Sequence, residues 1–85
     1  MSRPIEPVYK AIGLRMRMIR EALGLTQDEL AKRAAPITLT GLTGLQRTSI
    51  VNIEAGRQRI LLHDVERIAA ALGTTPKGLL RGIWT

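Results

Sequence analysis

The sequence is poor in several residue types, and each absence excludes a class of protein. Its 85 residues contain no cysteine, no phenylalanine and one histidine. The missing cysteines exclude a disulfide scaffold, and one histidine without cysteine cannot build an ordinary zinc site. The two aromatic residues, Tyr9 and Trp84, cannot form the stacking platform on which single-stranded nucleic acid binds. No apolar run approaches the roughly 18 residues that span a bilayer, and no secretory signal pattern is present, so we expect a soluble cytoplasmic protein.

The chain is strongly basic. Thirteen lysines and arginines, ten of them arginine, stand against seven aspartates and glutamates, which gives a net charge of +6. This excess on so short a chain favours a polyanionic partner, most often nucleic acid. The length allows one small domain, and we expect residues 1–85 to form it, with the core in residues 8–82.

Apolar residues recur at helical spacing, which predicts five short helices. We expect the first over residues 8–23, with Leu23 on its apolar face. Thr26 and Glu29 form a capping box that begins the second, because each side chain satisfies an orphan N–H of the other residue. Pro36 prevents this helix from continuing much further.

The last three helices follow the same spacing. Apolar residues predict helices over residues 47–54 and 62–72, the latter with Leu62 on its inner face. Thr75 at the cap and Pro76 at the first helical position begin the fifth. Between the second and third helices, residues 35–46 carry no charge, and a proline and two glycines favour a loop over a short strand there.

Two stretches carry recognisable motifs. They are Gly13-Leu-Arg-Met-Arg-Met-Ile-Arg20 with Gly24-Leu-Thr-Gln-Asp-Glu-Leu-Ala31, and Gly44-Leu-Gln-Arg-Thr-Ser-Ile-Val-Asn-Ile-Glu-Ala-Gly56-Arg57. The first resembles the opening helices of the Cro/CI-type (XRE) helix-turn-helix family. The second resembles its recognition helix and the turn that follows. The resemblance implies an all-α, five-helix, lambda-repressor-like domain that is prokaryotic or phage-encoded.

The sequence departs from this family pattern at one place. The family joins its second helix to the recognition helix by a three- to four-residue turn. Here residues 35–43 are extra, which predicts an extended turn between the second and third helices.

The resemblance implies a double-stranded DNA-binding regulator. A helix that enters the major groove reads bases with the outward side chains of its first turns. Arginine suits guanine, asparagine suits adenine, a hydroxyl suits a base or a phosphate, and valine can pack on a thymine methyl. The candidates for base contact are Arg47, Thr48, Val51 and Asn52.

Phosphate contacts position such a protein without reading sequence. By resemblance, Gln27 holds a phosphate and braces Arg47. The candidates for phosphate contact are Gln27, Arg57, Arg59 and Arg17, and Arg3, Lys10 and Arg15 would extend the same footprint.

Glu54 lies close to the buried side of its helix, where an unpaired carboxylate costs several kcal/mol. The family pairs this glutamate with an arginine of the first helix, so we expect a structural ion pair between Arg20 and Glu54. Proteins of this type commonly dimerise near the end of the domain. The predicted dimer interface consists of Leu79, Leu80, Ile83 and Trp84.

These inferences predict a transcriptional regulator, namely a repressor that binds a palindromic operator as a homodimer, without cofactor or metal. One alternative is an antitoxin-like module that neutralises a partner protein through residues 35–46 or the C-terminus and regulates its own operon. Another is a membrane-surface module that uses the basic first helix. An enzyme is not expected, because His63 and Asp64 are adjacent on a helix and there is no glycine-rich phosphate loop.

Overall fold

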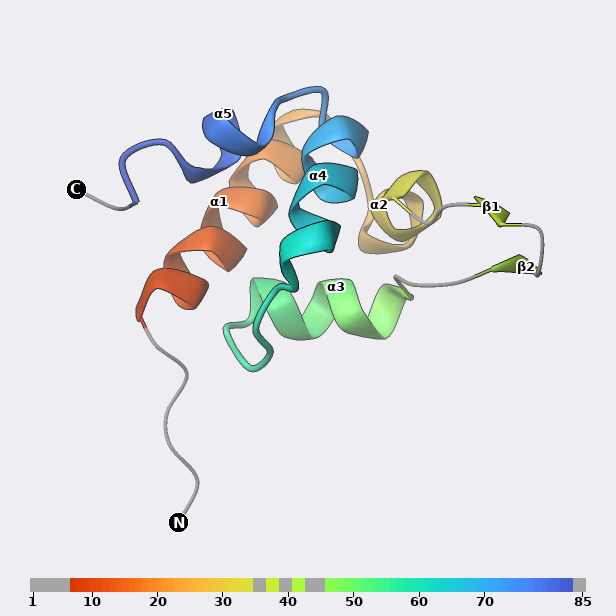
Figure 1. Cartoon of the computed structure of the whole chain (residues 1–85), viewed down its shortest axis with the longest axis horizontal. Helices are drawn as coiled ribbons and strands as arrows, with labels where there is room; N and C mark the ends of the chain where they lie inside the picture. The colour runs from red at the N-terminus through yellow and green to blue at the C-terminus, as the bar shows by residue number, and fades with distance from the viewer. Residues whose placement is uncertain (1–6, 35–36, 39–40, 43–45, 84–85) are drawn as a thin grey trace, which may run out of the picture.

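The computed structural model describes residues 7–34, 37–38, 41–42 and 46–83. Five helices pack around one core, and two short strands lie between the second and third helices (Figure 1). The predicted all-α, five-helix fold is confirmed. The elements are α1 Pro7–Ala22, α2 Gln27–Ala34, β1 Ile37–Thr38, β2 Gly41–Leu42, α3 Arg47–Glu54, α4 Leu62–Ala71 and α5 Pro76–Leu80.

Local signals set where α2 and α5 begin. The Thr26 hydroxyl accepts from the Glu29 N–H at 3.0 Å, and the Glu29 carboxylate accepts from the Thr26 N–H at 3.0 Å. The backbone hydrogen bond from Thr26 also holds the pKa of the Glu29 carboxyl below its ordinary value. At α5, the Thr75 hydroxyl accepts from the Gly78 N–H, and Pro76 stands at the first helical position. Both caps are the ones that the sequence predicts.

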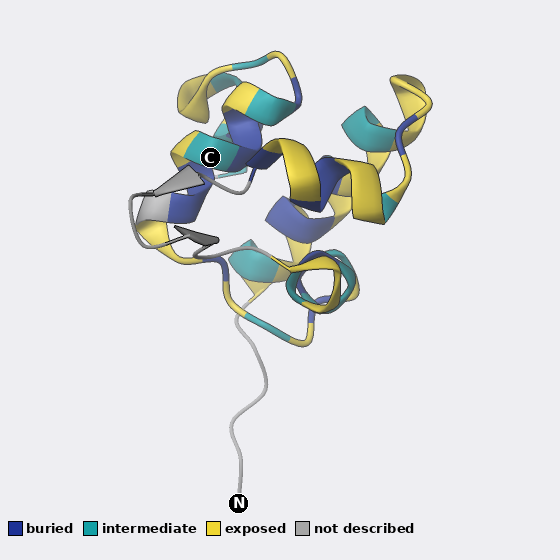
Figure 2. Cartoon of the chain, turned by 90° about the vertical axis from the view of Figure 1, so that its right-hand side faces the viewer, coloured by how far each residue is buried: buried dark blue, intermediate teal, exposed yellow. Residues whose placement is uncertain are grey.

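Every helix contributes to the core, whose buried segments face one another in Figure 2. In α1, Ile12 and Met16 are buried among α3 and α5, so the apolar side of this helix is used inside the domain. A membrane-surface module would need the apolar side of α1 to contact lipid, so the burial of Ile12 and Met16 argues against that alternative. The largest fully buried side chains are Met16, Leu30, Ile50, Ile53, Ile68 and Leu79.

Two leucines predicted to face inward are exposed instead. Leu23 lies just after α1 with 53% of its surface accessible, and Leu62, the first residue of α4, is 85% accessible. Each lies at a helix end, where the chain turns away from the core and helical spacing no longer decides burial. The nearby Ile60 fills the core in place of Leu62, at 6% exposure.

The predicted loop after α2 contains a small hairpin. Strands β1 and β2 pair antiparallel, with Ile37 opposite Leu42 and Thr38 opposite Gly41. The hairpin extends from the domain on the side of α2 and α3 (Figure 1). The proline and glycines of this segment favour a loop, and the two short strands lie within it. No helix in the described residues is long and apolar enough to cross a membrane.

Candidate nucleic-acid interface

The outward side of α3 carries the side chains predicted to read bases. Ile50 and Ile53 are buried, which turns the opposite side of the helix outward. Arg47 and Thr48 are exposed, while Val51 and Asn52 are partly buried at its edge. None of the four lies in the domain's interior, so this surface can enter a groove.

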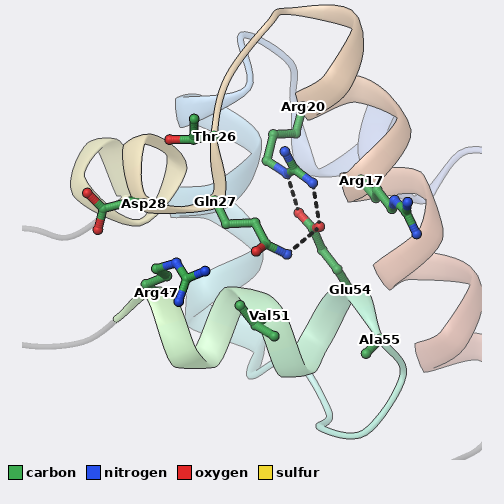
Figure 3. Close-up of a pocket in the computed structure, with 9 residues that line it drawn as sticks. All are labelled: Arg17, Arg20, Thr26, Gln27, Asp28, Arg47, Val51, Glu54 and Ala55. Atoms are coloured by element: carbon green, nitrogen blue, oxygen red, sulfur yellow. Dashed lines mark hydrogen bonds and ion pairs between the residues drawn. The ribbon is translucent and has the colours of Figure 1, made fainter.

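A cleft of about 570 Å³ lies beside this surface, between α1, α2 and α3 (Figure 3). Three arginines contribute to its walls, and its side chains come from all three helices. It therefore joins the predicted base-reading surface to the predicted phosphate-binding residues. The cleft is lined by Arg17, Arg20, Thr26, Gln27, Asp28, Arg47, Val51, Glu54 and Ala55.

The predicted pair between Arg20 and Glu54 forms the floor of this site. Arg20 donates from Nε to Glu54 Oε2 at 2.8 Å and from Nη2 to Oε1 at 2.9 Å. Only 11% of the Arg20 side chain and 3% of the Glu54 side chain are accessible. The hydrogen bond to Glu54 raises the pKa of the Arg20 guanidinium above its ordinary value. Arg20 Nη1 also donates to the Leu25 carbonyl at 2.8 Å, which ties in the turn before α2.

Gln27 joins the same network. Its Nε2 donates to Glu54 Oε1 at 3.2 Å, and Figure 3 shows the side chain extending from α2 toward that carboxylate. An amide nitrogen carries two hydrogens, so this bond leaves a second hydrogen and the carbonyl oxygen for other partners. Three helices thus meet at one carboxylate, which fixes their mutual orientation.

Helix α3 ends in a tight glycine turn. Gly56 has φ of +76°, its N–H donates to the Ile53 carbonyl at 3.1 Å, and the Arg57 N–H donates to the Asn52 carbonyl at 2.9 Å. This is a Schellman motif, which needs a left-handed residue and so favours glycine. The turn leaves Arg57 exposed. The Arg59 guanidinium carbon lies 5.8 Å from the centroid of the Tyr9 ring, within cation–π range.

Two further arginines of α1 have different environments. Arg17 lines the cleft and approaches Glu21 at 3.5 Å, with both side chains more than half exposed. Arg15, expected to extend the phosphate footprint, instead donates to the carbonyls of Gly78 at 3.4 Å and Arg81 at 2.9 Å. It caps the end of α5, because the end of a helix leaves carbonyls without partners. Arg3 lies outside the described residues.

The predicted dimer interface needs a correction. Leu79 has 0% exposure and belongs to the core, so it has no surface to offer a partner. Leu80 and Ile83 are partly buried, and Trp84 lies outside the described residues. An apolar groove of about 190 Å³ that includes Leu80 was not predicted from the sequence. The groove is lined by Val8, Tyr9, Ile12, Ile60, Leu62, Val65 and Leu80.

Comparison with known proteins shows the family. A family model described as a helix-turn-helix domain matches residues 11–81. The chain belongs to this helix-turn-helix family, as the two sequence motifs predict. The proteins of this family and the structural neighbours of the chain are DNA-binding transcription regulators rather than enzymes. The described residues also contain no group of three or more acidic, histidine or cysteine side chains that could hold a metal ion.

Named relatives agree with this class. The chain is 35% identical over 78 residues to a "Neisseria hypothetical transcription factor" from Neisseria meningitidis serogroup B. That match covers 91% of this chain but 65% of the relative, so the chain spans about two thirds of that protein's length.

Solved structures share the fold. The restriction-modification controller protein C.AhdI from Aeromonas hydrophila is 30% identical with a TM-score of 0.70, covering 84% of this chain and 94% of that one. The hypothetical transcription factor NHTF from Neisseria is 29% identical with a TM-score of 0.71, covering 94% of this chain and 84% of that one. The clp gene regulator ClgR from Corynebacterium glutamicum is 21% identical with a TM-score of 0.76, covering 95% of this chain and 77% of that one. At this identity the likeness supports the fold alone.

Proposed function

We propose that this protein binds double-stranded DNA at a specific sequence and represses transcription by occupying promoter DNA as a dimer. The observation that carries the proposal is the outward surface of α3, which lies beside an arginine-lined cleft. In this proposal residues 8–82 act as one recognition unit, with residues 35–43 as an insertion in its turn.

Each side chain of the α3 surface has a role in the proposal. Arg47 offers two parallel donors to guanine O6 and N7, a contact worth about 1–3 kcal/mol of discrimination. Val51 packs on a thymine methyl, and Asn52 pairs with adenine N6 and N7. Thr48 bonds a base edge or a neighbouring phosphate. Because Arg47 and Thr48 are exposed, they reach DNA without any rearrangement of the core.

Phosphate contacts supply most of the affinity in the proposal. Arg57 follows the recognition helix and is exposed, and Arg17 stands at the edge of the cleft. Arg59 contacts the Tyr9 ring. In the proposal its guanidinium binds a phosphate of the same DNA strand as Arg57. Gln27 donates its second amide hydrogen to a phosphate and accepts from Arg47 through its oxygen.

A dimer would place two recognition helices about one turn of DNA apart, roughly 34 Å, on a palindromic site. We assign the interface to Leu80, Ile83 and Trp84, without the buried Leu79. The apolar groove that includes Leu80 supports this assignment, because exposed apolar surface favours contact with a protein partner.

Selection from a pool of random duplexes tests the proposal. Wild type should enrich a palindromic motif, and Arg47→Ala should relax the choice of base at one position of each half-site. Arg57→Ala should instead weaken binding to all sequences alike and lower the salt slope by about one. Equal recovery of every sequence by wild type would remove specific regulation from the proposal.

A protein-binding role for residues 35–46 is the second candidate. In Figure 1 strands β1 and β2 extend away from the five helices, and this position supports contact with a partner. Deletion of residues 35–43 would leave a turn near the family's usual length, and we expect DNA binding to persist. Loss of a co-purified partner on deletion, with DNA binding intact, would favour the antitoxin-like alternative.

A further inference from the structure

The first turn of α1 lies against the turn that follows the recognition helix, and two contacts join them. The Lys10 stem covers Gly56, since a Cβ built on this glycine would lie 2.9 Å from Lys10 Cγ. Tyr9, the preceding residue, holds the guanidinium of Arg59 over its ring. Cations from α1 and from the glycine turn therefore gather at the C-terminal end of α3.

Lys10 also continues a basic row along α1. Lys10 and Arg17 are seven residues apart, which is nearly two helical turns and about 10.5 Å along the axis. They consequently share one side of the helix. Arg17 lines the cleft beside α3, and Lys10 carries the row past the end of that helix to Gly56.

We propose that Lys10 contacts a DNA backbone phosphate next to the C-terminal end of the recognition helix, and that Gly56 positions it there. The inference rests on the proposed DNA-binding function, and it adds to the expected phosphate contact of Lys10 a place on the DNA and a residue, Gly56, that positions it. Contact with Gly56 restricts the flexible lysine stem before DNA arrives, which lowers the entropy lost on binding. The exposed ammonium then supplies a charge that is independent of base sequence.

Salt titration of DNA binding tests the role of the charge. The probe is a fluorescein-labelled random-sequence duplex, followed by anisotropy between about 50 and 200 mM salt. Lys10→Met keeps an aliphatic stem over Gly56 but removes the charge, and it should lower the slope of log K against log salt by about 0.9. Lys10→Arg should keep the wild-type slope. Lys77→Met, an exposed lysine on α5, is the matched control and should also keep it.

The outcomes separate this inference from the proposed function. If wild type binds the duplex and Lys10→Met keeps the full slope, Lys10 makes no phosphate contact and the inference fails alone. If wild type binds neither this duplex nor any selected one, the proposed function fails and the inference fails with it.

A second variant tests the positioning. Gly56→Ala would press on the Lys10 stem, so it should lower the salt slope in the wild-type background but not in Lys10→Met. Far-ultraviolet circular dichroism at the assay temperature confirms that each protein is folded. An equal effect of Gly56→Ala on the slope in both backgrounds would contradict positioning by Gly56.

Discussion

Gly13 of α1 lies directly against the main chain of Ile53 in α3. A Cβ at Gly13 would collide with the Ile53 carbonyl oxygen and come within 3.2 Å of Glu54 Cα. The two helices therefore cross at a separation that only glycine allows. Because α3 carries the predicted base-reading side chains, this contact sets how far they stand from α1.

Gly13→Ala should destabilise the domain by about 2 kcal/mol. Alanine gains up to about 1 kcal/mol in helix propensity, but rigid backbone blocks its methyl group, so the clash outweighs the gain. Urea unfolding followed by circular dichroism measures the change. Ala11→Gly, on the exposed side of the same helix, isolates the propensity effect. A Gly13→Ala protein more stable than wild type would show that α1 and α3 can move apart freely.

Glu54→Gln should cost about 3 kcal/mol of unfolding free energy, because it leaves the nearly buried Arg20 charge without a counter-ion. It should also weaken DNA binding, since Gln27 loses its charged partner. Glu21→Gln is the control: its pair with Arg17 is exposed and should be worth less than about 0.5 kcal/mol. Similar losses in the two variants, measured by urea unfolding at equal ionic strength, would argue against a special role for the Arg20–Glu54 pair.

The capping box should make stability depend on pH. The backbone hydrogen bond from Thr26 lowers the pKa of Glu29 in the folded state, so its contribution is present above the unfolded value of about 4.3. That contribution is lost as the pH falls through the lower, folded pKa. Wild type should therefore exceed Glu29→Gln in stability at pH 7, and the difference should shrink in acid. A difference that stays constant across a pH series of urea unfolding curves would contradict this. Glu66→Gln, at an exposed position of α4, is the control.

Trp84 is the single tryptophan and should report dimer formation. Its emission should shift to shorter wavelength as protein concentration rises, because the interface removes the indole from water. Ile83→Glu should abolish the shift and halve the mass seen by analytical ultracentrifugation. Leu23→Glu, a change at an exposed leucine on another part of the surface, should leave both intact. A wild type that stays monomeric at the concentrations used for DNA binding would remove the dimer from the proposed function.

Much of the fold could be predicted from short-range signals. The third helix begins and ends where the spacing of Ile50 and Ile53 and the turn at Gly56 place it. Caps such as Thr26 with Glu29 act between residues three positions apart, so the sequence alone contains them. The Arg20–Glu54 pair spans 34 positions and could be predicted only through the family resemblance.

Other features depend on how distant segments meet. Leu79 and Leu80 are neighbours in a short helix, and only tertiary packing decides that Leu79 is the one in the core. Arg15 follows an ordinary helical pattern, and nothing near it in sequence shows that α5 ends beside it. Two other features could be inferred from the sequence. A glycine inside a helix costs stability, so Gly13 indicates a close approach of another segment. Lys10 lies seven residues before Arg17, which places both on one side of the helix.

The meeting of Arg20, Gln27 and Glu54 has a consequence for how this domain can change its target. The side chains of Arg20, Gln27 and Glu54 form the network that orients α3. Arg47 and Thr48 lie outside this network and are exposed at the start of the helix. Exchange of those two residues costs the network almost nothing. A library diversified at these two positions should keep its architecture in most members, and under the proposed function we expect its members to differ in the bases they select.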